Sequence, residues 1–355
     1  MTTIILAFFS IVFLMTFHEF GHFLAAKKAR VKVEEFGLGY PPRIFAKKIG
    51  ETLFSLNLLP LGAFVKILGE EGEEKEAEGS FATQPILKRA FIVAAGCLSF
   101  WLISFFLFSL VFKLGTLVPV SANEEAETIQ IVDVLKGSPA FFATLKPQDI
   151  IEKIVFEGKV YPVKTIKEFQ ELTKNFAGKE ITLIVKRENQ TLEVSLTPRQ
   201  KYPEGEGPIG IAILGLKTEK YPLILAILKG AKQTFLLSWY ILKEYSMILV
   251  RLIKKETIPA KLVGPVGIMN MFNEAARRGM AYFLQFVGLV SLHLAIFNLL
   301  PIPALDGGKL LFLGIEALRK KPVDPNTEKK ITAFFFGILV CLAIFVTIKE
   351  ILEIF

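Results

Sequence analysis

The chain has 355 residues, 52% of them hydrophobic and only 21% charged, which is the balance of a membrane protein with a soluble part and not of a soluble enzyme. The formal net charge is +8, but no base-reading motif accompanies it, so we expect no nucleic-acid partner. The two cysteines, Cys97 and Cys341, each lie in an apolar run, which argues against a disulfide framework or a thiolate metal site.

Four apolar runs are long enough to cross a bilayer, which takes about 20 residues. They cover roughly residues 4–26, 90–112, 282–300 and 331–348. The first run has no basic residue ahead of it and ends in a polar motif, so we interpret it as a retained span and not as a cleaved signal. The sequence therefore predicts a polytopic α-helical membrane protein with four transmembrane helices.

Lysine and arginine indicate the orientation of these spans, because cytoplasmic loops are enriched in both. Basic residues follow the first span at 27–32, precede the second span at Lys88 and Arg89, and join the third span to the fourth at 319–330. We therefore expect both termini, and the long region between the second and third spans, on the outer side of the membrane.

The first cytoplasmic loop has an apolar part and a charged part. ETLFSLNL and GAFVKILG predict two strands around the turn LPLG, and their apolar character favours a place against the membrane interface. The charged run EEGEEKEAEG, which starts at Glu70, is typical of a solvated, mobile linker.

A soluble module follows the second span. TIQIVDV, DIIEKIVF, EITLIVKR and TLEVSLTP predict short strands and KTIKEFQELTKNF predicts a helix, so we expect a small inserted α+β module from about Pro119 to Gln200. The stretch from Tyr221 to Lys255 is too charged for an ordinary span and predicts an amphipathic helix on the outer membrane surface.

These expectations divide the chain into eight segments. In chain order they are a first transmembrane helix (1–27), a cytoplasmic-side loop with a membrane-associated β-hairpin (28–89), a second transmembrane helix (90–114), the α+β module (119–200), an amphipathic membrane-surface helix (219–256), a connecting segment that contains GPVGI (257–280), a third transmembrane helix broken at the motif LDG (281–318) and a fourth transmembrane helix (331–355).

The stretch HEFGH at the end of the first span contains residues that can bind a metal ion and activate water. Residues four apart share a helix face, so His18 and His22 can both direct a ring nitrogen at one metal ion. Glu19 lies about 100° around the helix from His18, within reach of a water on that ion, as in zinc peptidases. A lone buried histidine is usually a satisfied core residue, but two histidines and a glutamate in lipid are costly unless they bind something.

A catalytic zinc takes three protein ligands, so one more donor is needed. The intramembrane candidates are His293, a lone histidine on an apolar helix, and Asp306 in NLLPIPALDGG. Pro301 and Pro303 cannot continue a helix, and broken backbone at membrane depth survives where it lines a cavity. Asp306 could simply cap the helix that follows, which is compatible with metal binding; we favour Asp306 as the third ligand.

These residues resemble the site-2 protease family of intramembrane zinc metalloproteases, in its bacterial RseP-type branch. HEFGH is similar to the family's H-E-x-x-H, and NLLPIPALDGG to its N-x-x-P-x-P-x-L-D-G, whose aspartate is the third ligand. LPLGAFVK resembles its membrane-associated loop, GSFATQPILKRA its approach to the second span, GSPAFFATLKPQDII the start of its PDZ module and GPVGI a segment near the third span. The space in this chain fits a single PDZ domain.

Four positions depart from the family pattern. The second span reads AAGCLSF where the family usually has A-G-P-x-x-N, so Cys97 and Phe100 replace a proline and an asparagine. Gln148 replaces a usual PDZ glycine, and Gln84 a usual lysine. These departures leave open what the two residues of the second span contribute.

The resemblance implies one Zn²⁺ per chain, held by His18, His22 and Asp306, with Glu19 as the general base, in a bacterial inner membrane. The substrate would be the transmembrane segment of a single-span protein, such as an anti-sigma factor or a signal-peptide remnant, typically shortened first by another protease. Asn298 would bind substrate backbone. The apolar hairpin within residues 51–69 would hold the unwound strand by edge pairing, with Leu61, Gly62, Ala63 and Phe64 as the substrate-binding residues; the alternative is an interface anchor without substrate contact.

Three other functions remain open from the sequence. A PDZ-bearing membrane binding protein could keep a metal site that does not turn over. A transporter also uses broken helices with buried aspartate, but the two motif-bearing spans do not resemble each other as inverted repeats would. A protease for soluble substrates is disfavoured by the depth of the motif in the bilayer.

Overall fold

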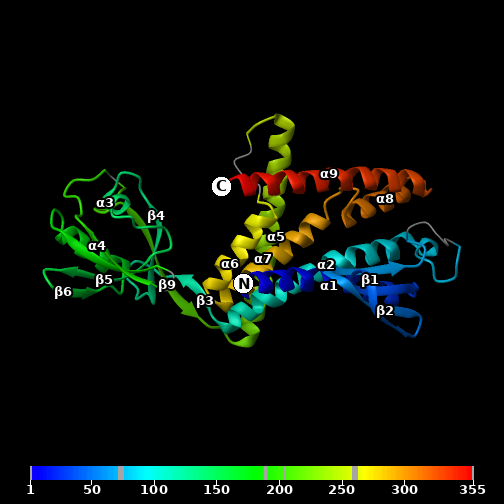
Figure 1. The fold of residues 1–355 in the computed structure, drawn as a ribbon, viewed down its shortest axis with the longest axis horizontal. Coiled ribbons are helices and arrows are strands. Elements are labelled where there is room, and N and C mark those ends of the chain that lie inside the picture. Colours follow the sequence, from blue (N-terminus) through cyan, green and yellow to red (C-terminus); the bar gives the residue numbers. More distant parts are fainter. Residues whose placement is uncertain (1, 71–75, 188–189, 204, 258–262, 354–355) are drawn as a thin grey trace. The chain divides into compact units, whose positions relative to one another are not determined.

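The computed structural model describes residues 2–70, 76–187, 190–203, 205–257 and 263–353, and it divides into two compact units (Figure 1). The helical unit comprises Met1–Val111 and Leu223–Phe355, and the inserted unit comprises Phe112–Pro222. The inserted unit is therefore longer at both ends than the predicted module. Residues 71–75, within the charged run predicted as a linker, lie outside the described residues.

Four helices in the described part of the chain are long and apolar enough to cross a membrane, in agreement with the four predicted spans. They are α1 (Thr2–Lys28), α2 (Ile86–Leu114), α7 (Met280–Asn298) and α9 (Pro325–Leu352). The other elements of the helical unit are β1 (Val33–Ile49), β2 (Thr52–Ile67), the 3-10 turn η1 (Phe81–Thr83), α5 (Leu223–Lys254), α6 (Pro265–Arg277) and α8 (Asp306–Arg319).

Small residues let the helices of this unit approach closely. A Cβ at Gly21 of α1 would meet the hydroxyl of Ser99 and the carbonyl of Ala95 on α2. In the same way, Gly230 of α5 lies against Ser109 of α2. Close backbone approach through small residues is the usual way in which helices associate in lipid, where apolar burial gives little driving force.

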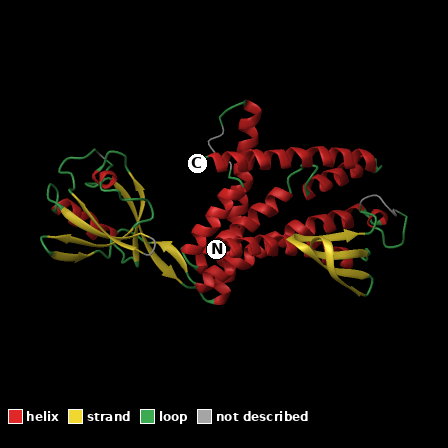
Figure 2. Ribbon diagram, viewed as in Figure 1, coloured by secondary structure: helices red, strands yellow, loops and turns green. Residues whose placement is uncertain are grey.

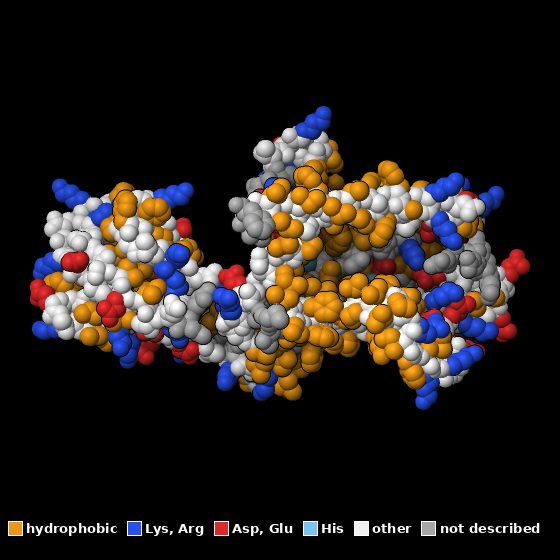
Figure 3. All heavy atoms as spheres, in the orientation of Figure 1, with side chains coloured by type: hydrophobic (Ala, Val, Ile, Leu, Met, Phe, Trp, Pro, Cys, Tyr) orange, Lys and Arg blue, Asp and Glu red, His pale blue; other side chains and the backbone are white. Residues whose placement is uncertain are grey.

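The helical unit exposes apolar side chains along its spans. In the face shown in Figure 3, orange side chains cover the middle of this unit, whereas charged side chains gather toward one end. On α9, Phe334 and Phe345 are each 65% exposed. Such surface would be costly in water but fits contact with lipid.

Helix α5 is outside the set of four candidate spans. Its Ile241 is buried against Phe108 of α2 and against Leu292 and Ile296 of α7. This helix therefore packs on the spans through one face. Its place at the membrane surface stays a prediction.

Strands β1 and β2 replace the simple hairpin that the sequence suggested (Figure 2). The two predicted strands both belong to β2 but do not pair with each other, because the first half of β1 lies between them. Gly37 pairs with Phe64 on one side and with Ser55 on the other. Among the described residues, 63–67 pair with a strand on one side alone, which leaves the other side of this segment as an edge.

The inserted unit is a mainly antiparallel sheet around its own core. Its strands run in the order β3-β9-β4-β5-β7-β8, with β6 paired to β5. Its elements are β3 (Thr116–Pro119), β4 (Thr128–Val134), α3 (Pro139–Phe142), β5 (Ile150–Phe156), β6 (Lys159–Pro162), α4 (Ile166–Asn175), β7 (Ile181–Arg187), β8 (Gln190–Leu196) and β9 (Ile211–Glu219). The four strands and the helix predicted from the sequence are all present, and β9 adds a strand beyond the predicted end.

Local signals in the inserted unit explain its elements. Thr165 and Glu168 form a capping box at the start of α4, which satisfies backbone donors at both positions. The core is apolar, with Ile131, Ile154 and Leu183 fully buried. Gln148, the departure from the usual PDZ glycine, has a φ of 78°, in the left-handed region that favours glycine.

Candidate metal centre

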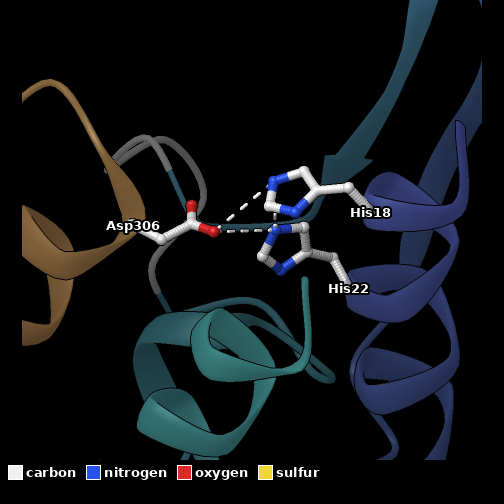
Figure 4. Close-up of side chains that lie close together, drawn as sticks. All are labelled: His18, His22 and Asp306. Carbon is white, nitrogen blue, oxygen red and sulfur yellow. Dashed lines mark hydrogen bonds and ion pairs between the residues drawn. The ribbon is translucent and has the colours of Figure 1, made fainter. Parts of the chain in front are cut away.

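Helix α1 carries His18 and His22 one turn apart, on the face that points toward α8 (Figure 4). Their Nε2 atoms are 3.3 Å apart. Both residues are buried, at 6% and 8% exposure. The spacing of four residues thus produces the shared face that the sequence predicted.

Asp306 comes from the first turn of α8, after the break that separates α8 from α7. Its Oδ2 lies 3.4 Å from Nε2 of His18 and 3.4 Å from Nε2 of His22. The glycines after it are required by the tight backbone: a Cβ at Gly307 would meet the carbonyl oxygens of Leu299 and Leu300. The break therefore lets α8 begin where the carboxylate of its first residue faces the two imidazoles.

The three donor atoms form a nearly equilateral triangle with edges of 3.3–3.4 Å. Donors of a tetrahedral zinc, each about 2.0–2.1 Å from the ion, lie about 3.3–3.4 Å apart, so the triangle fits three corners of that tetrahedron. Two imidazoles and a carboxylate are also a donor set that catalytic zinc sites use. The residues present therefore fit a zinc ion with a fourth position open.

The two histidines are held in different ways. Nδ1 of His22 lies 2.9 Å from the carbonyl oxygen of Ile92 on α2, which fixes the proton on Nδ1 and turns Nε2 toward the donor triangle. His18 instead stacks on the ring of Phe100, with ring centroids 4.6 Å apart and planes inclined by 17°. Its Nδ1 is buried without a partner in hydrogen-bonding geometry among the described residues, although the backbone of Gly96 lies beside the ring.

Glu19 lies next to the same groups. It is half-buried, and its carboxylate is close enough to His22 and Asp306 to interact with their charges. It also interacts with the backbone of Val65, in the edge segment of β2. The candidate general base is therefore within electrostatic range of the donor triangle and interacts with a strand edge.

Helix α2 contributes groups to the site that the sequence did not assign. A Cβ at Gly96 would overlap the ring of His22 and lie 2.7 Å from Cε1 of His18, so α2 can approach α1 here through glycine alone. Sγ of Cys97 lies 3.4 Å from Oδ2 of Asp306. The signal was present in the sequence, because Cys97 and Phe100 are two of the departures from the family pattern.

The predicted substrate-binding residues fall in two places. Gly62 lies beside Met15 of α1, Ala63 is 2% exposed and Leu61 is 63% exposed, which places this stretch of β2 against the helix of the histidines. Phe64 covers Gly37 in the neighbouring strand. Asn298 donates from Nδ2 to the carbonyl of Leu294 in its own helix.

His293 stays outside the donor cluster. Its Nδ1 lies 3.0 Å from the carbonyl of Leu289, one turn earlier in the same helix. Its ring faces Tyr245 of α5, at 6.4 Å between centroids. This is the satisfied histidine that a lone position on an apolar helix suggested.

A cavity of about 760 Å³ lies beside α8, bordered by α2, α9 and the residues that follow β2. Two ion pairs cross its wall. Arg89 of α2 binds Glu316 of α8 at 2.5 Å, and Lys309 of α8 binds Glu70 at 2.5 Å. Helix α8, which carries Asp306, is therefore tied to α2 and to the end of β2 through charged contacts.

Known proteins are similar to this chain over nearly its full length. The family model for peptidase family M50 matches residues 6–343. A protein of Clostridium perfringens provisionally named a zinc metalloprotease is 30% identical over 352 residues, which cover 98% of each chain. The regulator of sigma-W protease RasP of Bacillus subtilis is 28% identical over 431 residues, again 98% of each chain, and the zinc metalloprotease RasP of Oceanobacillus iheyensis is 25% identical over 438 residues, the whole of both chains.

Proposed function

The chain belongs to peptidase family M50, and from this premise we propose that it is an intramembrane zinc metalloprotease that cuts the transmembrane segments of single-span proteins. The observation that carries the proposal is the triangle of His18, His22 and Asp306, with edges of 3.3–3.4 Å, inside an apolar helical unit. Buried imidazoles and a carboxylate in lipid are costly unless they bind an ion.

In this proposal the three residues hold one zinc ion, and each has a defined part. His18 and His22 offer Nε2, and Asp306 offers Oδ2. The Ile92 carbonyl keeps the proton of His22 on Nδ1, so Nε2 stays available as a ligand. When bound, zinc supplies a Lewis acid that lowers the pKa of a water toward 7 and polarises the scissile carbonyl.

Glu19 is the proposed general base. Its carboxylate accepts a proton from the attacking water and passes it to the leaving amine. Its position beside His22, Asp306 and the backbone of Val65 supports this role, because the group must reach both the donor triangle and the peptide to be cut.

The edge of β2 is the proposed platform for the substrate. A transmembrane helix hides its peptide carbonyls in hydrogen bonds, so the segment must unwind locally before it can be cut. Residues 63–67 have a strand partner on one side alone among the described residues, so an unwound segment can add to the other side by edge pairing. In this arrangement Leu61, Gly62, Ala63 and Phe64 line the path, and Asn298 offers its amide to substrate backbone.

The substrate class follows from the same features. One relative is named a regulator of sigma-W protease, which supports regulatory single-span proteins such as anti-sigma factors; signal-peptide remnants meet the same requirement. We place both termini and the inserted unit outside a bacterial inner membrane, with the catalytic centre toward the cytoplasmic side. The inserted unit, as a PDZ domain, acts as a size filter or binds the exposed C-termini of substrates that another protease has already shortened.

Cleavage of a single-span reporter with a short outer tail tests the proposal. The full chain in detergent is assayed as wild type, as Glu19→Gln and after treatment with a zinc chelator, and zinc is counted in each sample. We expect cleavage by the wild type alone, with zinc still bound to Glu19→Gln. Intact reporter in every sample, despite one zinc per chain, would favour a PDZ-bearing binding protein whose metal site does not turn over. Cleavage that survives Glu19→Gln would overturn the role of that residue.

A further inference from the structure

Helix α2 presents one face to the candidate metal centre, and each of the three donor residues touches a different group on that face. Ile92, Gly96 and Phe100 are spaced four residues apart and therefore form one stripe, with Cys97 at its border. Ile92 meets His22, Phe100 meets His18 and Cys97 meets Asp306. The helix thus carries no donor of its own in the triangle, yet it contacts every donor.

The contact of Cys97 with Asp306 is a hydrogen bond from a thiol to a carboxylate. The distance from Sγ to Oδ2 is 3.4 Å, and Cys97 is 1% exposed and forms no disulfide. A carboxylate that ligates a metal is commonly held by a further hydrogen bond, which fixes the direction of its oxygens. Asp306 is the first residue of α8 and follows a break in the backbone, so its own helix restrains it from one side only. A contact with another helix therefore contributes more to the orientation of this carboxylate than it would in the middle of a regular helix.

The contact of Phe100 with His18 is a stack of two rings. The two rings are 4.6 Å apart and nearly parallel, and Phe100 is 0% exposed. Nδ1 of His18 is buried without a partner in hydrogen-bonding geometry among the described residues. The plane of this imidazole is therefore restrained by stacking on Phe100, beside the backbone of Gly96, whereas the plane of His22 is restrained by the carbonyl of Ile92.

We propose that Cys97 and Phe100 are positioning residues of the zinc site: the thiol orients the carboxylate of Asp306, and the aromatic ring orients the imidazole of His18. This inference rests on the proposed function, because it assigns the two residues to the same metal. The two residues that stand in place of the family's proline and asparagine thus each touch a donor directly.

Metal binding by the full chain in detergent tests the role of Cys97. Zinc affinity is measured by competition with a chromophoric chelator, and the geometry of the site is followed through the visible spectrum of the Co²⁺-loaded protein. Cys97→Ala is expected to lower zinc affinity on the order of tenfold and to alter the Co²⁺ bands, because loss of such a contact typically costs 10–100-fold. Cys97→Ser keeps a donor and is expected to restore both readouts. Cys341→Ala changes the chain's other cysteine, which is exposed, and should match the wild type.

Phe100 is tested in the same assays. Phe100→Leu removes the stacked ring and is expected to lower zinc affinity roughly tenfold with a changed Co²⁺ spectrum. Phe106→Leu, at a phenylalanine of α2 that is 64% exposed, is the matched control and should leave both unchanged. If Phe100→Leu fails to fold, Phe100→Tyr, which keeps the stacking face, must retain the wild-type spectrum for the proposal to stand.

The outcomes separate the inference from the proposed function. Wild-type affinity and spectrum in Cys97→Ala, or equal losses in Cys97→Ala and Cys97→Ser, would overturn the hydrogen-bonding role of the thiol. A sulfur-to-Co²⁺ charge-transfer band in the wild type would overturn it as well, since the thiol would then be a ligand itself. A wild-type chain that binds neither metal would contradict the proposed function, and this inference would fail with it.

Discussion

The two regions that bring donors to the metal centre achieve their geometry by different means. Helix α1 is unbroken over 27 residues, and the helical repeat alone places His18 and His22 on one face. Asp306 begins a helix after a break of the backbone, and the position of that helix depends on contacts with other elements. The positions of the two histidines are thus set by the local sequence of α1, whereas the position of Asp306 is set by contacts between α8 and other elements.

Helices α2 and α9 hold α8 and the break before it in place. Arg89 binds Glu316 at 2.5 Å, at the far end of α8 from the donor. Thr332 of α9 donates to the carbonyl of Pro303 within the break, at 3.1 Å. This difference indicates which changes should affect the site most. Changes at the contact between α1 and α2 should displace the two histidines directly and lower zinc affinity. Changes at the ion pairs that hold α8 should have weaker effects, mainly on the free energy of unfolding.

The largest effect is expected at the contact between α1 and α2. Gly96→Ala adds a Cβ that overlaps the ring of His22 and crowds His18. We expect zinc affinity to fall on the order of 100-fold, at the upper end of effects seen when groups around ligands are changed. Gly314→Ala, in open space on α8, is the matched control. Equal zinc affinity in the two variants, measured by chelator competition, would show that the close approach of α2 does not limit the site.

The corresponding change in the second region is Gly307→Ala. Its Cβ would meet the carbonyls of Leu299 and Leu300, which are backbone atoms that cannot move cheaply. We expect α8 to shift and zinc affinity to fall roughly tenfold, because the histidine pair stays intact. Isothermal titration with zinc measures the loss, with Gly337→Ala, in open space on α9, as the control. A larger loss than in Gly96→Ala would reverse the ranking of the two regions.

A tether of α8 gives the next effect. The side chains of Arg89 and Glu316 are 12% and 15% exposed, so Arg89→Met leaves a carboxylate without its partner in a poorly solvated place. We expect this single change to lower the free energy of unfolding by about 3 kcal/mol, and Arg89→Met combined with Glu316→Leu to recover most of it. Thermal unfolding in detergent measures both. A double variant as unstable as the single one would mean that packing, and not charge pairing, dominates this contact.

The smallest effect is expected at the second tether. The side chain of Lys309 is 42% exposed, against 18% for its partner Glu70, so solvent screens the pair. Lys309→Met should therefore change the free energy of unfolding by about 1 kcal/mol or less. A shift in the unfolding temperature larger than that of Arg89→Met would show that Lys309 does more than pair with Glu70.

The sequence predicted the regular region better than the irregular ones, for a physical reason. HEFGH specifies its own geometry once it lies on a helix, and apolar length marks the spans. The prolines and glycines of NLLPIPALDGG predicted a break, but no local rule gives the position of the helix that follows. That position is set by contacts distant in sequence, such as Arg89 with Glu316.

Two features were missed because they depend on pairing between distant elements. The strand β1 contains the charges and prolines of VEEFGLGYPPRIFAKKI, which hide any alternation, and its insertion between two parts of β2 is a non-local arrangement. The contacts of Cys97 and Phe100 were hidden because α2 is apolar on all sides, so periodicity does not show which face meets the site.

The most direct test of the account is zinc K-edge X-ray absorption on the purified full chain. We predict one zinc per chain with nitrogen and oxygen ligands at about 2.0–2.1 Å, scattering from two imidazoles, and no sulfur at about 2.3 Å. Scattering from two imidazoles would show that both histidines of α1 bind the zinc. Loss of one oxygen scatterer in Asp306→Ala would show that the aspartate of α8 binds it as well. A sulfur shell in the wild type, a single imidazole, or an unchanged spectrum in Asp306→Ala would contradict a site built jointly by these two regions.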